Sequence, residues 1–179
     1  MRIDTIVNLP VIETERLILR PLRRSDAGLM ELYGADERVA RMTRSIPHPL
    51  PPGVTESFIT RALSDDREED VWVLDGSSRG LGELLGLIAL ERMDRDQSEI
   101  GYWVAPAFWN TGLASEAVRA LVDANPQENR TMFASVFQDN PASARVLTNT
   151  GFQYLGDAEA YSVARGATVP TWTYLKRYA

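Results

Sequence analysis

Alternation between apolar and polar positions predicts most of the β-strands in this chain. Arg16–Leu22 shows the two-residue period of a strand with one buried face. Val71–Asp75 and Glu83–Arg92 read as two strands joined by a stretch rich in turn formers, so they predict a hairpin. The same pattern predicts further strands at Ile100–Ala105, Met132–Phe137, Phe152–Leu155 and Thr171–Tyr178.

Segments in which apolar residues have helical spacing lie between these strands. It predicts helices at Ala27–Tyr33, Val54–Leu63, Leu113–Ala124 and Pro141–Thr150. Met42–Gly53 holds four prolines and reads as a loop, and the charged run Ser64–Asp70 reads as a solvated connection. No repeat or linker interrupts the pattern. We therefore expect one α/β domain over residues 1–179, with a mixed sheet and helices on both faces.

Composition narrows the class of protein and of partner. With 179 residues and 44% hydrophobic content, the chain can bury a real core. No apolar run approaches the ~20 residues of a membrane helix, and the N-terminus lacks the charged-then-apolar pattern of a signal peptide, so we expect a cytoplasmic protein. The formal net charge of −6 argues against nucleic-acid partners and favours cationic ones such as amines.

Residues that are absent or rare exclude several chemistries. The chain has no cysteine, which excludes disulfides, thiolate metal sites and acyl-cysteine intermediates. His48 is the single histidine, so a histidine-rich metal site is excluded; we expect it on the surface, with a substrate pocket as the alternative. Gly76–Gly80 matches the Gly-x-Ser-x-Gly elbow of serine hydrolases. A strand rather than a helix follows it, and we interpret it as a hairpin turn.

The segment from Glu99 to Ala117 predicts a socket for phosphate. A strand ends at Pro106, and the turn Trp109–Ala114 opens a helix, so several backbone N–H groups lack intrahelical partners and point outward together. The helix dipole adds roughly half a positive charge at this end, and Gly112 has no Cβ to block close approach of a pyrophosphate.

This turn also resembles a known family. Its spacing, Trp-x-x-Gly-x-Ala, is similar to the acetyl-CoA loop of the GNAT N-acetyltransferases, in which Gln or Arg more often holds the first position. Variants with tryptophan there resemble the Rim-type branch, which acetylates N-termini of ribosomal proteins; Asn110 replaces the second glycine of that variant. Asn140–Phe152 resembles the family's second cofactor segment, and Thr14–Leu22 resembles the first strand of the Rim-type branch.

The resemblance implies a fold and a binding site for acetyl-CoA as cosubstrate, without a metal. It implies a mainly antiparallel, twisted sheet with a V-shaped splay between Ile100–Ala105 and Met132–Phe137, into which the pantetheine arm inserts. A backbone N–H near Val104 would face the thioester carbonyl. The implied acetyl-CoA contacts are Val104, Trp109, Asn110, Thr111, Gly112, Leu113, Ala114, Asn140 and Ser143.

The sequence identifies the residues that transfer protons less clearly than it identifies the acetyl-CoA contacts. Glu99, at the head of its strand, is the first candidate for a general base, with a solvated strand-end charge as the alternative. Some Rim-type relatives carry a glutamate where this chain has Leu155. Many family members have a tyrosine where this chain has Leu147, and the Rim-type branch implies that the Ser143 hydroxyl serves the leaving thiolate instead.

The predicted function is direct transfer of an acetyl group from acetyl-CoA to a primary amine. A protein N-terminus, a polyamine, an amino sugar and a small amine all stay open as acceptors, because Met42–Leu63 and Tyr161–Thr171, where we expect the acceptor site, carry no motif. The alternative is a sensor or regulatory module that binds acyl-CoA without turnover. Neither nucleic acid nor membrane is an expected partner, and a homodimer stays open.

Overall fold

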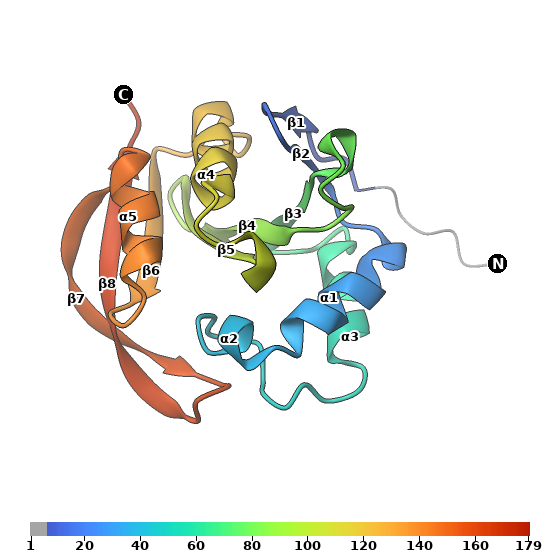
Figure 1. The fold of residues 1–179 in the computed structure, drawn as a ribbon. Coiled ribbons are helices and arrows are strands. Elements are labelled where there is room, and N and C mark those ends of the chain that lie inside the picture. Colours follow the sequence, from blue (N-terminus) through green and yellow to red (C-terminus); the bar gives the residue numbers. More distant parts are fainter. Residues whose placement is uncertain (1–6) are drawn as a thin grey trace.

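A single twisted sheet organises the molecule. The computed structural model describes residues 7–179, and residues 1–6 of the predicted domain lie outside the described residues. The described residues form an eight-stranded sheet in the order β1-β2-β3-β4-β5-β6-β8-β7 (Figure 1). The strands are β1 Ile12–Glu13, β2 Ile18–Pro21, β3 Glu69–Asp75, β4 Gly86–Met93, β5 Gln97–Val104, β6 Thr131–Phe137, β7 Gln153–Ser162 and β8 Ala167–Arg177.

Helices cover both faces of this sheet, as the sequence predicted. They are α1 Ala27–Gly34, α2 Glu37–Ala40, α3 Val54–Ala62, α4 Leu113–Ala124 and α5 Pro141–Asn149. Because successive side chains of a strand point to opposite faces, β3 contributes to two cores. Val71 and Val73 pack in the cluster that contains residues of α1 and α3, whereas Trp72 and Leu74 pack in the one that contains residues of α4 and α5.

The sheet splays open between β5 and β6, the only parallel neighbours among the described strands. Pairing covers only Gln97–Glu99 of β5 against Thr131–Phe133 of β6. Beyond this point β5 stays paired with β4, and β6 stays paired with β8 to its last residue. The rest of β5 and β6 therefore diverge as a V, which confirms the predicted fold class (Figure 1).

The structure adds elements that the pattern did not predict. β1 and α2 are too short to give a periodic signal. β7 and β8 run well beyond Phe152–Leu155 and Thr171–Tyr178, because paired strands can extend over exposed residues that carry no apolar alternation. Their hairpin reaches the segment after α2, where Val163 N–H donates to the carbonyl of Arg44 at 3.0 Å.

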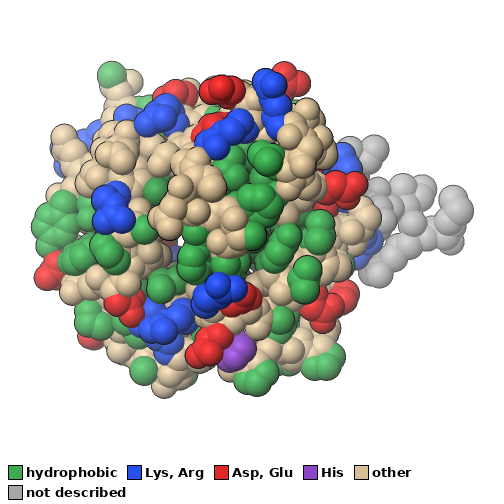
Figure 2. All heavy atoms as spheres, viewed as in Figure 1, with side chains coloured by type: hydrophobic (Ala, Val, Ile, Leu, Met, Phe, Trp, Pro, Cys, Tyr) green, Lys and Arg blue, Asp and Glu red, His purple; other side chains and the backbone are tan. Residues whose placement is uncertain are grey.

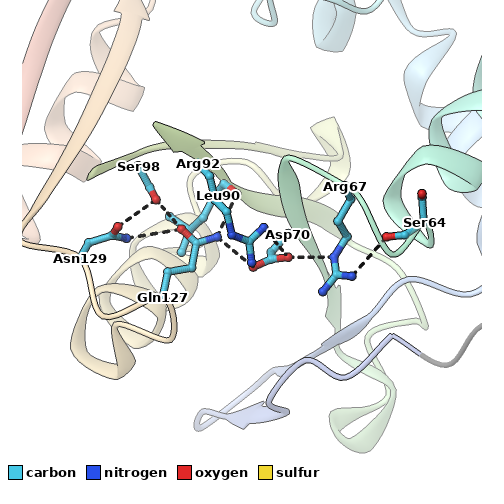
Figure 3. Close-up of polar contacts among 8 residues, drawn as sticks. All are labelled: Ser64, Arg67, Asp70, Leu90, Arg92, Ser98, Gln127 and Asn129. Atoms are coloured by element: carbon cyan, nitrogen blue, oxygen red, sulfur yellow. Dashed lines mark hydrogen bonds and ion pairs between the residues drawn. The ribbon is translucent and has the colours of Figure 1, made fainter. Parts of the chain in front are cut away.

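The interpretation of Ser64–Asp70 as a solvated connection is wrong at its end. Asp70 is 2% exposed and lies in β3. Its carboxylate accepts hydrogen bonds from Arg67 at 2.9 Å, Arg92 at 2.6 Å and Gln127 at 2.8 Å (Figure 3). Gln127 also contacts Ser98 in the paired part of β5. The buried charge is thus neutralised in place, and this network joins strands at the closed end of the V.

Candidate functional site

One cavity of about 710 Å³ runs through the splay. It is lined by the diverging parts of β5 and β6, by the first turns of α4 and α5, and by α1, α3 and the segment between α2 and α3. Figure 2 shows apolar side chains gathered in the hollow between the α4 side and the α2 side of the molecule, with cationic side chains at its rim. The cavity therefore joins the region of the predicted phosphate socket to the region of the predicted acceptor site.

The predicted phosphate socket has free donors. Gly112 is the N-cap of α4 with φ of 80° and supplies no capping side chain. The first helical hydrogen bond runs from Glu116 N–H to the carbonyl of Gly112, so the N–H groups of Leu113, Ala114 and Ser115 have no helical acceptor. These residues line the cavity, together with Asn110 and Thr111. An anion placed there would meet backbone donors and the positive end of the helix dipole.

Arg16, which the sequence reasoning did not single out, shapes this socket. Its guanidinium donates to Glu116 and to the carbonyl of Thr111, at 2.8 and 2.9 Å. A Cβ on Gly112 would lie 3.4 Å from the same guanidinium. Although partial burial raises the pKa of Glu116, hydrogen bonds from Thr14 and Arg16 hold that pKa below its usual value. The only feature of the sequence that pointed to Arg16 was the resemblance of Thr14–Leu22 to the first strand of the Rim-type branch.

Trp109 ties the loop to the end of β5. Its indole N–H donates to the carbonyl of Val104 at 2.6 Å, and the residue is 40% exposed. Ala105 N–H donates to Leu85 on the β4 side. Because backbone groups alternate in direction along a strand, the N–H of Val104 points to the other side, toward the splay.

Ser143 and Tyr102 form a pair across the opening. Asn140 caps α5 as predicted, since its side chain accepts from Ser143 N–H at 3.3 Å. The Ser143 hydroxyl donates to the phenol oxygen of Tyr102 at 2.8 Å, and the phenol donates to the Ser143 carbonyl at 3.1 Å. Burial raises the pKa of Tyr102 well above its usual value, so the phenol keeps its proton. Leu147, where many members of the resembling family carry a tyrosine, is buried in the core.

Glu99 lies on the opposite face of β5 from Tyr102, because the two positions differ by an odd number. It is the last β5 residue that pairs with β6, so it marks the apex of the V. Its carboxylate forms an ion pair with Arg44 at 2.8 Å. The two predicted catalytic residues, Glu99 and Ser143, both line the cavity. They lie on different sides of the sheet, because Ser143 contacts Tyr102 and Glu99 lies on the opposite face. Leu155 is exposed on β7 and does not line it.

The segments expected at the acceptor site play two different roles. Much of Met42–Leu63 lines the cavity, whereas only Thr171 does so from Tyr161–Thr171. The hairpin instead fixes the wall: Arg165 donates to the carbonyl of Arg41 at 2.9 Å and pairs with Asp139 at 2.6 Å. His48 is exposed outside the cavity lining.

Comparison with known proteins decides the family. The acetyltransferase (GNAT) domain model matches residues 16–153. The chain belongs to the GNAT acetyltransferase family. The N-acetyltransferase YoaA of Bacillus subtilis is 28% identical to this GNAT chain over 170 residues, covering 92% of this chain and 95% of that protein.

Solved structures show the same fold. RimL, a ribosomal L7/L12 α-N-protein acetyltransferase in complex with coenzyme A, superposes with a TM-score of 0.80 at 17% identity, over 94% of this chain and 98% of that one. A spermidine N-acetyltransferase from Vibrio cholerae, in complex with CoA and spermine, gives 0.77 at 16% identity, over 92% and 96%. The family match confirms the GNAT resemblance predicted from the sequence. The chain is therefore an acetyl-CoA-dependent N-acetyltransferase.

Residues 7–179 contain no group of three or more His, Cys, Asp or Glu side chains arranged to hold a metal ion. None of the helices in that range is long and apolar enough to cross a membrane.

Proposed function

We propose that this GNAT protein transfers an acetyl group directly to a primary amine, either a small molecule or a protein N-terminus, inside the cavity that crosses the splay. The observation that carries this proposal is the continuity of that cavity. It reaches the free N–H groups at the start of α4, the Ser143 hydroxyl and the Glu99 carboxylate. The proposed anion site, proton donor and base thus line one cavity.

The residues present fit acetyl-CoA, which supplies the acetyl group as a thioester and leaves as a thiol. The loop Trp109–Ala114 would hold the pyrophosphate through backbone N–H groups, because Gly112 leaves the approach open. Val104 N–H, turned into the splay, would polarise the carbonyl without reorganising. The Asn140 side chain uses its oxygen for capping, which leaves its amide nitrogen for the pantetheine arm.

The pair formed by Ser143 and Tyr102 would supply the proton that the departing sulfur needs. The Ser143 hydroxyl lies at the start of α5, where the helix dipole favours a thiolate. When the Ser143 hydroxyl turns from Tyr102 and gives its proton to the sulfur, its oxygen can accept a hydrogen bond from the phenol, and water would then restore the serine proton. Burial raises the pKa of Tyr102, so the phenol keeps its own proton and would orient the Ser143 hydroxyl rather than replace its proton.

Glu99 would accept a proton from the incoming amine, directly or through water. An α-amine with a pKa of about 8 is roughly one-tenth neutral at pH 7, whereas a lysine amine is almost wholly charged, so base assistance matters more for the second. The carboxylate occupies the apex of the V on the acceptor side, 2.8 Å from the guanidinium of Arg44.

The test is an acceptor screen that follows both products. Protein, acetyl-CoA and a panel of amines and peptides are incubated, and free CoA and acetylated acceptor are quantified by mass spectrometry. We expect the two in equal amounts for at least one amine. Saturable binding of acetyl-CoA without any transfer would favour the non-catalytic sensor instead. Absence of binding would contradict both functions.

A further inference from the structure

The acceptor half of the cavity has a chemical character of its own. We call this half the acceptor chamber: the space enclosed by α1, α3, residues 42–50 and the face of the sheet that carries Glu69, Glu99 and Gly101. Much of its wall is apolar, with Met30, Leu50 and Phe58 among the lining side chains. An acceptor that fills it would bury a hydrophobic body.

The floor of the chamber is made of small residues. Gly101 of β5 lies opposite Ala89 of β4, and a Cβ built on Gly101 would meet no atom within 4 Å. The strand face is therefore open next to Glu99, only two residues along β5. The space beside the carboxylate can receive the carbon skeleton of a substrate.

Both signs of charge line this chamber. Glu69, Glu91 and Glu99 are in register on adjacent strands, and Glu69 and Glu99 line the chamber with Arg44 and Arg61. The Glu99 side chain is paired with Arg44, whereas the described residues show neither a hydrogen bond nor an ion pair to the side chains of Glu69 and Arg61. Burial raises the pKa of Glu69, as do Glu91 and Glu99, while Arg44 and Arg61 act against this rise.

These charges discriminate between kinds of amine. A simple cation that binds Glu99 must displace Arg44 and leave that guanidinium without its partner, which opposes binding. A polyamine would need a surplus of carboxylates, and the arginines of the chamber balance its glutamates. A zwitterionic ligand can replace the ion pair between Arg44 and Glu99 with two new ones. Its amine would pair with the Glu99 carboxylate, and its anionic group with the Arg44 guanidinium. Arg61 adds a second cation for the anionic group.

We infer that the acceptor is a small amine that carries its own anionic group and an apolar body, of the kind represented by a hydrophobic α-amino acid. This inference rests on the proposed transferase function and narrows it. In it, Glu99 and Glu69 hold the amine, Arg44 and Arg61 hold the anion, and the apolar wall with Gly101 holds the side chain.

The test compares acceptors that differ in one group. The probes are L-phenylalanine, 2-phenylethylamine, L-phenylalaninamide, spermidine and a tripeptide that begins with phenylalanine, together with L-leucine and L-methionine. A charge-assisted interaction predicts that kcat/KM for L-phenylalanine exceeds that for 2-phenylethylamine by about tenfold or more. Arg61→Gln should bring this ratio down several-fold. Arg177→Gln, which removes an exposed arginine outside the cavity lining, should leave it unchanged.

The outcomes separate failure of this inference from failure of the proposed function. Equal or better transfer to 2-phenylethylamine or spermidine would overturn the inference and leave the transferase standing. Equal or better transfer to the tripeptide would replace it with a protein N-terminus. Binding of acetyl-CoA without CoA release in the presence of every probe and of the wider amine panel would count against the transferase itself. If Arg61→Gln left the ratio of kcat/KM for L-phenylalanine to that for 2-phenylethylamine unchanged, Arg61 would not bind the anionic group.

Discussion

The two halves of the cavity are built on different principles. On the proposed cofactor side, the donors would be backbone N–H groups from one continuous stretch, β5 through the Trp109–Ala114 loop to the first turn of α4. On the acceptor side, Arg44, Arg61, Glu69 and Glu99 come from separate elements, and the hairpin of β7 and β8 fixes the wall from a distance. Binding in the first half would depend on the conformation of the backbone. Binding in the second half would depend on which side chains the fold brings together.

This difference predicts that the two halves respond differently to substitution. A backbone donor does not change with most substitutions, so the proposed anion socket would tolerate Asn110, which stands where the resembling Rim-type variant has glycine. A charge in the acceptor chamber disappears with a single replacement. Specificity for the amine can thus change without disturbing the cofactor side.

The largest expected effect is on proton handling. Ser143→Ala should lower kcat by about 10²-fold or more at every pH, because stabilising a departing thiolate does not depend on the charge of the acceptor. Tyr102→Phe should do the same more mildly, and Glu99→Gln should instead recover as rising pH deprotonates the amine. Steady-state kinetics between about pH 6 and pH 9.5, the span in which amines lose their proton, separate these profiles. Near-normal turnover in all of these variants would leave attack by a free amine, positioned by the sheet alone.

Gly112→Val should damage the cofactor half. A β-branched residue at φ of 80° is strained by about 1–3 kcal/mol, and its side chain would approach the guanidinium of Arg16, so the loop must move. We expect the dissociation constant for acetyl-CoA, measured by calorimetry, to rise by about tenfold or more. Circular dichroism should show the helix and strand content retained. Unchanged affinity would place the phosphate socket elsewhere.

Gly101→Val is the matched change in the acceptor half. Gly101 lies in extended backbone with open space at its Cβ position, so valine should fit the strand and fill the chamber. We expect KM for the amine to rise by about tenfold, as for moderate overpacking of a site, with acetyl-CoA affinity within about twofold of the original. Equal losses for both substrates would show that the halves do not act separately.

The smallest effect concerns stability. Burial raises the pKa of Glu69, so the folded protein binds this proton more tightly than the unfolded chain does, and stability falls as pH rises through the raised pKa. Glu69→Gln removes that loss. Thermal unfolding should show a higher Tm by a few degrees at pH 7.5, corresponding to about 1 kcal/mol, and a smaller gain near pH 4.5. Glu159→Gln, at an exposed position of β7 that does not act on the pKa of Glu69, is the control. A lower Tm in Glu69→Gln would show that the carboxylate stabilises the fold.

The same contrast shows what could be predicted from sequence. The strands, the splay and the capping by Asn140 follow from periodicity, family resemblance and local hydrogen bonding, all of which are written in short stretches. The contact of Tyr102 with Ser143 could not be read from the sequence, because it joins residues that are 41 positions apart. The burial of Asp70 was missed for the same reason: its neutralising partner Arg92 comes from another strand.

Hydrogen–deuterium exchange with and without saturating acetyl-CoA tests the central claim most directly. The account predicts slower exchange at Val104 and at Leu113–Ser115, whose N–H groups face the cavity without helical or β4 acceptors, and little change in Met42–Leu63 when no amine is present. Protection confined to Met42–Leu63, or none at either place, would contradict it.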